Sequence, residues 1–414
     1  MSDSNIKTNQ SGFAALYLTL LILTASLALT ASIFVLNLTQ QKDTQNTVRS
    51  SQSYYLAEAG IEDAILRIKN SMPISSNYTV TIGSEQAAVS IASPNSNTRV
   101  IRAIGTKGNV SKTLEAQLSI QSVNPEFFYG AQAGAGGIEL DNLSGITGNV
   151  FSNGSIGAEP GTEITGTVQV SGVGNKIDGA VIGENAYVNI CDDSDVGGIL
   201  YSAIQIGCSF SSFVATSSLP SAVSLPISDQ NIADWKAEAE AGGTINGNQN
   251  FSGGSNSLGP VKIVGDLTVQ NDAEIIINGT VWVTGNIIIK NNAKVYLSFS
   301  YGFLSGMIIA DGTITLENNS ISSGSGQVGS YLMYISTSGS NPALTIKNSA
   351  RADVLYTSSG WLQVENNANL REITGYGIHL KNNARITYEV GIQDAFFSSG
   401  PGGSWKVVSW KEVE

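Results

Sequence analysis

A seven-residue pattern that recurs in this chain constrains its fold more than any other feature. The pattern is apolar-x-apolar-x-Asn-x-Ala/Ser, and it reads LTVQNDA from Leu267, IIIKNNA from Ile287 and ITLENNS from Ile314. Further copies begin at Ile138, Leu344, Leu362 and Ile378, and a partial copy, VIGENAYV, begins at Val181. Apolar residues at every second position are typical of β-strands, and a strand pattern that repeats at irregular intervals is typical of a solenoid with loops between its coils.

The asparagine in each copy has the same parity as the aliphatic residues, as in Leu267, Val269 and Asn271. Side chains two apart in a strand face the same way, so we expect the asparagine to point inward. It would stack as a ladder of amides beside a bend, where asparagine tolerates the left-handed conformation. The predicted ladder is Asn142, Asn271, Asn291, Asn318, Asn348, Asn366 and Asn382. These copies predict a right-handed parallel β-helix, and the alternative is a β-sandwich with coincidental asparagines.

An uncharged apolar run extends from Phe13 to Leu38. At about 1.5 Å per residue a helix of this length spans about 39 Å, more than the ~30 Å hydrocarbon core of a bilayer. It is also longer than the apolar region of a secretory signal peptide, which is usually about 7–15 residues. We therefore expect residues 13–38 to be a transmembrane helix.

The helix is expected to continue beyond the membrane through Gln40–Asn70 and to end before Pro73. Apolar residues there recur at spacings of three and four, which predicts one face packed on a core. The stripe comprises Tyr54, Ala57, Ile61, Ala64, Ile65 and Ile68. Alternating runs between Tyr78 and Gln121 then predict a small antiparallel sheet. Together they form an α+β module over residues 39–124.

The N-terminal junction resembles a class III prepilin signal, with a short polar leader, Met1–Gly12, and an aromatic residue, Phe13, before a long apolar helix. The segment SYYLAEAGIEDAILRIKN, Ser53–Asn70, resembles the corresponding part of PilX-type minor pilins and pseudopilins. The resemblance implies that a prepilin peptidase cuts between Gly12 and Phe13. It implies a protein held in the inner membrane before assembly and then carried to the pilus or cell surface. A plain signal anchor is the alternative.

Tyr17 is the fifth residue after the implied cleavage site. Major pilins have a glutamate there, whose carboxylate neutralises the α-amino group of a neighbouring subunit in the apolar filament core. An unpaired charge buried there would be costly. Because Tyr17 cannot form that pair, the resemblance implies a low-copy subunit at or near the filament tip.

The composition argues against several classes of function. A net charge of −12 is unsuited to nucleic acid, which needs a basic face. His379 is the only histidine, so histidine-based metal sites and Ser-His-Asp triads are nearly excluded by count. The acidic residues of the late repeats are scattered, mostly at outward positions: Asp311, Glu317, Asp353, Glu365 and Glu372. We therefore expect no catalytic residues, no metal and no cofactor.

Two cysteines, Cys191 and Cys208, are predicted to form a disulfide if this part of the chain lies outside the membrane. The alternative is two buried thiols. The acidic cluster that starts at Cys191 and ends at Asp195 offers oxygen ligands for Ca²⁺, but it lacks the spacing of an EF-hand loop. A solvated turn is the favoured interpretation.

The predicted β-helix occupies residues 125–397, with an excursion at about 209–260 that contains a short helix from Asn231 to Ala241. Residues 398–414 are predicted to be a strand that returns to the sheet formed by residues 99–120. The expected function is a minor pilus component, with other pilins as partners, whose β-helix serves adhesion or primes filament assembly. Its ligand would be a surface glycan or a host or abiotic surface. A membrane-anchored protein that binds or acts on polysaccharide, or a plain structural spacer, are the alternatives.

Overall fold

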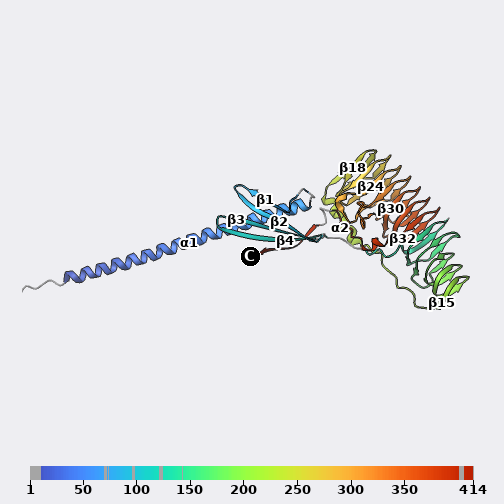
Figure 1. Ribbon diagram of the computed structural model, residues 1–414, viewed down its shortest axis with the longest axis horizontal. Helices are drawn as coiled ribbons and strands as arrows, with labels where there is room; N and C mark the ends of the chain where they lie inside the picture. Colours follow the sequence, from blue (N-terminus) through green and yellow to red (C-terminus); the bar gives the residue numbers. More distant parts are fainter. Residues whose placement is uncertain are drawn as a thin grey trace, which may run out of the picture. The chain divides into compact units, whose positions relative to one another are not determined.

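The computed structural model describes residues 11–69, 72, 74–95, 98–120, 125–141, 143–400 and 405–413. The chain forms two compact units, both drawn in Figure 1. The helix-and-sheet unit contains residues up to Arg67, residues 73–118 and residues 407–414, and the β-helix unit contains mainly residues 119–406. The predicted leader, residues 1–12, lies outside the described residues except for its last two positions.

Helix α1 (Ser11–Lys69) is continuous over 59 residues. All side chains from Ala15 to Leu38 are exposed. This is the one helix among the described residues that is long and apolar enough to cross a membrane. Farther along, Ala57, Ile61 and Ala64 of the predicted stripe are buried, its other three members are half-buried, and Leu56, outside the stripe, is also buried. One helix therefore has an exposed apolar half and an amphipathic half that packs on a sheet.

The sheet of this unit has five strands in the order β1-β2-β3-β4-β34. Strand β2 pairs antiparallel with both β1 and β3. The last strand comes from the far end of the chain, and an ion pair of 3.1 Å joins its Lys411 to Glu115 of β4. The chain therefore returns to this sheet after completing the β-helix. The bounds are β1 (Asn77–Ile82), β2 (Glu85–Asn95), β3 (Thr98–Lys107), β4 (Val110–Ile120) and β34 (Trp405–Val413).

The second unit is a parallel β-helix with three stacks of strands, so the predicted fold class is confirmed. In most coils aliphatic side chains fill the interior and alternate along each strand with more exposed ones, as in β20 (Leu267–Gln270) and β22 (Val281–Val283). The first stack contains, in spatial order, β16 (Thr244–Asn246), β19 (Val261–Val264), β22 (Val281–Val283), β25 (Gly306–Ala310), β28 (Leu332–Ser336), β30 (Arg351–Thr357), β32 (Asn369–Leu380), β5 (Ala131–Leu140), β7 (Val150–Ser152), β10 (Val168–Val170), β13 (Ala186–Asp192), β14 (Asp195–Ile206) and β15 (Ser209–Ala215).

The other two stacks share the long strands β5, β13, β14, β15, β30 and β32 with the first stack. The second stack adds β17 (Gln249–Ser252), β20 (Leu267–Gln270), β23 (Ile287–Ile289), β26 (Ile314–Leu316), β29 (Leu344–Ile346), β31 (Trp361–Val364), β8 (Ile156–Ala158) and β11 (Lys176–Asp178). The third adds β18 (Ser255–Leu258), β21 (Glu274–Ile277), β24 (Lys294–Leu297), β27 (Ile321–Ser323), β33 (Arg385–Thr387), β6 (Gly145–Thr147), β9 (Glu163–Ile164) and β12 (Val181–Ile182).

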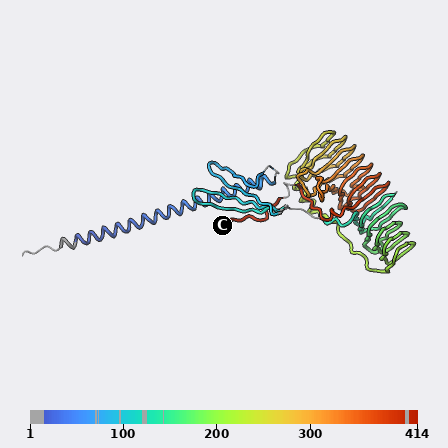
Figure 2. Tube along the Cα trace, in the orientation of Figure 1, coloured from blue at the N-terminus to red at the C-terminus, as the bar shows by residue number. Residues whose placement is uncertain are grey.

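The coils do not stack in chain order. Strand β32 pairs in parallel with β5, which brings Ile373 opposite Ala131 and Ile378 opposite Ile138. The chain therefore enters the β-helix in the middle, at β5, and forms successive coils as far as β15 at one end. It then returns to the other end, where β16 begins the coils that continue to β33 in the middle. In Figure 2 the colours along the β-helix accordingly run from yellow through orange to red, and then from teal to green.

The segment that leaves the coils is shorter than the predicted excursion of about 209–260. Strand β15 (Ser209–Ala215) is the last coil at one end, and β16–β18 form the first coil at the other end. The intervening residues run back along the outside and include helix α2 (Asp229–Ala241), which begins with a capping box between Ser228 and Asn231. Residues 244–258 therefore form a coil rather than part of the excursion; because this terminal coil is largely exposed and polar, its sequence lacks the aliphatic alternation.

Apolar side chains on the outer face of the first stack explain why the return segment covers it. Strands β25 and β28 are buried on both faces, which is typical of strands packed between two layers. Ile232 and Trp235 of α2 belong to the same buried cluster as Met307 and Met333 of these strands. The Tyr356 hydroxyl also donates a 2.8 Å hydrogen bond to the carbonyl of Ile227. The return segment thus forms a second core outside the coils.

Gly105 sits where β3 meets α1, and a Cβ there would lie 2.1 Å from the carbonyl oxygen of Ser53 and 2.6 Å from the amide nitrogen of Ala57. Since both contacts are backbone atoms, Gly105→Ala should force α1 off the sheet and cost more than the ~1–3 kcal/mol usual for overpacking. Hydrogen exchange of the Leu56–Ala64 amides measures this locally. Gly339→Ala is the control, since no atom lies within 4 Å of its Cβ, and protection unchanged by Gly105→Ala would contradict the prediction.

Candidate functional site

The apolar half of α1 is the first candidate interaction surface. Leu21 and Leu23 are about two-thirds exposed, and Tyr17 is 68% exposed on the same segment. Hydroxyl side chains in this half bond back to carbonyls of their own helix, as Thr30 does to Ser26 and Leu27. Their polar groups are therefore satisfied internally, as a lipid or helix environment requires. The predicted processing residues Gly12 and Phe13 lie within α1, so nothing in its backbone separates them from the apolar run.

The asparagine ladder forms along one corner of the β-helix. The amide of Asn291 donates to Asn271 at 3.1 Å, and that of Asn318 donates to Asn291 at 3.1 Å. The series continues through Asn348, Asn366 and Asn382 at 2.8–2.9 Å. Asn142, the remaining predicted member, lies outside the described residues.

The predicted inward orientation of these asparagines is wrong. Asn271, Asn348 and Asn382 are exposed and Asn291, Asn318 and Asn366 are half-buried, so none of the six lies in the aliphatic interior. Each ladder asparagine has a φ of +54° to +56° and is followed by a second residue with φ near +60°. Two successive left-handed residues break the alternation of side chains along the strand. Asn271 therefore does not face the same side as Leu267 and Val269.

From Asn291 onward, the residue before each ladder asparagine carries a charge whose sign alternates from coil to coil, whereas Asn271 follows the uncharged Gln270. In spatial order these residues are Lys290, Glu317, Lys347, Glu365, Lys381 and Asp141. Ion pairs of 3.4 Å join Lys347 to Glu317 and Lys381 to Glu365. Asp141 continues the alternation of sign after Lys381, and this pattern in the sequence indicates the permuted order of the coils.

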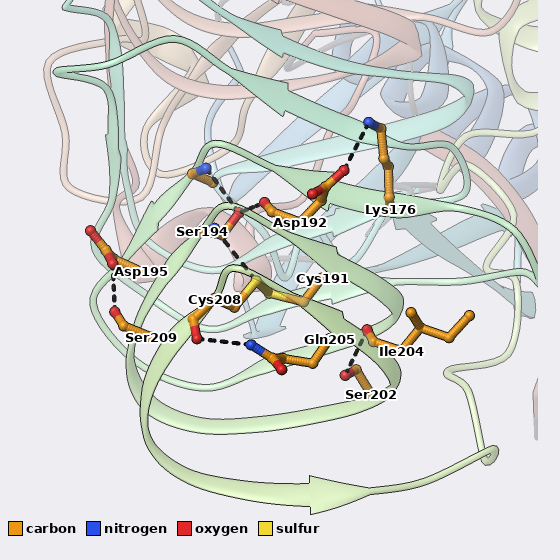
Figure 3. Close-up of a disulfide and its surroundings, with 11 residues drawn as sticks. Lys176, Cys191, Asp192, Ser194, Asp195, Ser202, Ile204, Gln205, Cys208 and Ser209 are labelled. Carbon is orange, nitrogen blue, oxygen red and sulfur yellow. Dashed lines mark hydrogen bonds and ion pairs between the residues drawn. A yellow bond between two sulfur atoms is a disulfide. The ribbon is translucent and has the colours of Figure 1, made fainter.

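Cys191 and Cys208 form a disulfide near the end of the β-helix at which β15 lies (Figure 3). Their Cα atoms are 6.4 Å apart, and both residues are buried. Closing a loop of this size is worth about 3 kcal/mol. In the adjoining acidic cluster, Asp192 pairs with Lys176 at 3.5 Å and Asp195 accepts a hydrogen bond from Ser209. The bridge joins two successive coils close to β15, which is the last strand of the first stack in the described part of the chain.

A polar network on the side of the β-helix is the second candidate site. Asp353 is only 3% exposed, and its carboxylate accepts backbone hydrogen bonds from Gly324 at 2.8 Å and Leu332 at 3.0 Å. Arg371 pairs with Asp353 at 3.2 Å and with Glu389, which also accepts a 2.9 Å bond from the Tyr331 hydroxyl. These groups line a cavity of about 310 Å³. Burial raises the pKa of Asp353 to about 6, against the opposing effects of its hydrogen bonds and of Arg371.

Two of the acidic residues placed at outward, solvated positions are in fact buried. Asp353 is held in the network above, and Glu372 of β32 is fully buried. Burial raises the pKa of Glu372 well above its usual value, although a 2.5 Å hydrogen bond from Thr374 opposes the shift. The alternation of side chains along a strand does not predict this burial, because it does not show which outward-facing residues are covered by a segment distant in sequence.

Comparison with known proteins adds little to this description. No protein-family model and no curated protein matches the sequence. A solved structure, that of the competence-associated pilin ComZ from Thermus thermophilus, aligns with 88% of this chain and 97% of that chain. The sequence identity is 10% and the TM-score is 0.34, a level at which the similarity carries no argument about function.

Asn318 lies in the middle of the ladder, and two variants separate its backbone role from its side-chain role. Asn318→Ala should lose about 2–4 kcal/mol, because it strains a left-handed backbone and removes two amide hydrogen bonds. Asn318→Gly should lose only about 1–2 kcal/mol, since glycine adopts positive φ freely. Denaturant unfolding measures both, and equal losses would show that the left-handed backbone is not what selects asparagine here.

Glu372→Gln should change the pH dependence of stability. Since the folded pKa of Glu372 lies above its unfolded value, the folded state holds this proton more tightly, and stability falls as pH rises from about 4.5 through the folded pKa. Each unit of difference is worth about 1.4 kcal/mol. Glutamine keeps the acceptor for Thr374 without the charge, so the variant should unfold at a higher denaturant concentration than wild type at pH 8 and at a similar one at pH 4. A parallel shift at both pH values would contradict this.

Proposed function

We propose that this chain is a minor subunit of a type IV pilus-like filament that presents its β-helix at the cell surface. The observation that carries the proposal is the division of α1 into an exposed apolar half and a half packed on a small sheet. Apolar surface of this extent is unfavourable in water and must be covered. A bilayer covers it in the inner membrane before assembly, and the stems of other pilins cover it in a filament.

The junction Gly12–Phe13 supports processing by a prepilin peptidase at the cytoplasmic face of the membrane. Cleavage before the apolar run leaves that run on the mature protein, where it serves as the stem. The resemblance of residues 53–70 to PilX-type minor pilins supports the same assignment. The role that we propose for the β-helix carried by this stem is non-enzymatic, in adhesion or in priming assembly.

Tyr17 supports a position at or near the filament tip. A subunit in the shaft places its α-amino group beside the stem of a neighbour, where a buried charge needs a partner. Tyr17 supplies a hydroxyl and no charge, so this subunit offers no counter-ion to a neighbour's amino group. A tip subunit needs to offer none.

The tests are N-terminal mass spectrometry of the mature protein and immunogold labelling of sheared filaments with antibody to the β-helix. We expect a mature chain beginning at Phe13, loss of this processing in Gly12→Val, and label confined to filament tips. Tyr17→Glu should allow label along the shaft, because the carboxylate restores the missing pair. An uncleaved chain found only on cell bodies would contradict the pilin assignment, and label spread along wild-type filaments would contradict the tip position alone.

The second candidate is a membrane-anchored protein that acts on surface polysaccharide. The network of Asp353, Arg371 and Glu389 favours it, because it places two carboxylates around one cavity. Glycoside hydrolysis requires such a carboxylate pair. Turnover of a polysaccharide by the protein, abolished by Glu389→Gln, would support this candidate over a purely adhesive role.

A further inference from the structure

Two adjoining cavities open on the same side of the β-helix. The first has a volume of about 310 Å³ and the second about 420 Å³, and both are lined by Ser323, Asp353 and Arg371. Each volume is within the ~300–1,000 Å³ typical of small-molecule sites. Because the cavities share these three residues, they offer one elongated site.

The second cavity is amphipathic. Ile321 and Ala352 supply an apolar surface, while Arg351, Asn369 and Arg371 supply donors. The strand register places Ile321 opposite Arg351 and Arg351 opposite Asn369, so the three occupy successive coils of the third stack. Neighbouring coils lie about 4.8 Å apart, so polar groups recur along the site at a regular spacing.

The guanidinium group of Arg371 is held in a fixed orientation by its neighbours. Asp353 and Glu389 each engage a different guanidinium nitrogen, and the guanidinium lies 5.6 Å from the centre of the Tyr331 ring. A guanidinium has five N–H donors, so N–H groups beyond these two contacts stay available. Buried Asp353 and the backbone bonds that fix it therefore determine the direction in which Arg371 points.

Arg351 differs from Arg371 in having no charge partner. Its side chain is exposed, and no hydrogen bond or ion pair joins its guanidinium to another residue in the described parts of the chain. Arg351 is thus an unpaired positive charge at the wall of a cavity in a protein whose net charge is −12. A planar carboxylate matches its fork of N–H donors.

We propose that this elongated site binds an acidic oligosaccharide. A uronate carboxylate pairs with Arg351, ring hydroxyls bond with Arg371 and Asn369, and the C–H face of a sugar ring packs on Ile321 and Ala352. A simple inorganic anion would need neither the apolar surface nor the length of two cavities. This inference concerns the β-helix unit alone, and it rests on the proposed function only in assigning the binding a role in adhesion.

The test is isothermal titration calorimetry of the full chain in detergent with hexamers of galacturonate, of alginate and of hyaluronan, and with maltohexaose as the neutral probe. We expect at least one acidic hexamer to bind and maltohexaose to bind at least about tenfold more weakly. Arg351→Ala should weaken binding of the acidic hexamer by about tenfold or more, and Arg351→Lys should restore part of it, because lysine keeps the charge without the fork. Thermal unfolding of Arg351→Ala should match wild type, since the side chain is exposed.

Arg385→Ala is the matched control. Arg385 is an exposed arginine on the same row, opposite Asn369, but its guanidinium is bonded to Asn383 at 3.2 Å and it lines neither cavity. Its removal should change binding by less than about twofold. Failure of all three acidic hexamers to bind, equal binding of maltohexaose, or equal losses in the two alanine variants would each overturn the proposal. None of these results bears on processing at Gly12, so the filament role is tested separately.

Discussion

The parallel pairing of β32 with β5 is the contact on which the whole β-helix depends. It joins coils that begin near residue 244 to coils that begin near residue 131, and it aligns Ile378 with Ile138 in the aliphatic interior. Without it the unit would be two shorter stacks, each exposing an unpaired strand edge and an apolar cross-section to water. The same pairing determines where the chain enters and leaves the β-helix, because β5, where it enters, and β33, in the final coil, both lie beside this junction.

The permuted order has consequences for the rest of the unit. Since the chain reaches β15 at one end and must begin again at β16 at the other, residues 216–243 have to run the length of the coils. They cover the apolar outer face of the first stack, and α2 places Ile232 and Trp235 against it. The hydroxyl of Tyr356 in β30 also bonds to the carbonyl of Ile227 in this segment. The covered outer face of the first stack is therefore a product of the return path.

Much of the architecture was predictable from residue patterns. The long helix, its amphipathic half and the parallel β-helix follow from apolar periodicity, since a side chain's direction in a helix or strand depends mainly on its position in that element. The amide ladder was predictable for the same reason, except at its bend, where two left-handed residues reverse the expected side of Asn271 and its equivalents. The polar network was not predicted. Asp353, Arg371 and Glu389 are brought together by different coils, and no spacing in the sequence encodes that distance.

The sequence by itself determined the period-two alternation, the asparagine corners and the apolar stem, because each is a local property of a few neighbouring residues. It also contained the alternation of Lys381 with Asp141 across the junction, although that signal is interpretable only once the coils are ordered. Only the tertiary structure decided that order, the covered face and the cavity. Each depends on which distant strands hydrogen-bond to one another, and parallel strands of similar aliphatic pattern are locally interchangeable as partners. The packing of the complete β-helix unit decides which of these strands pair.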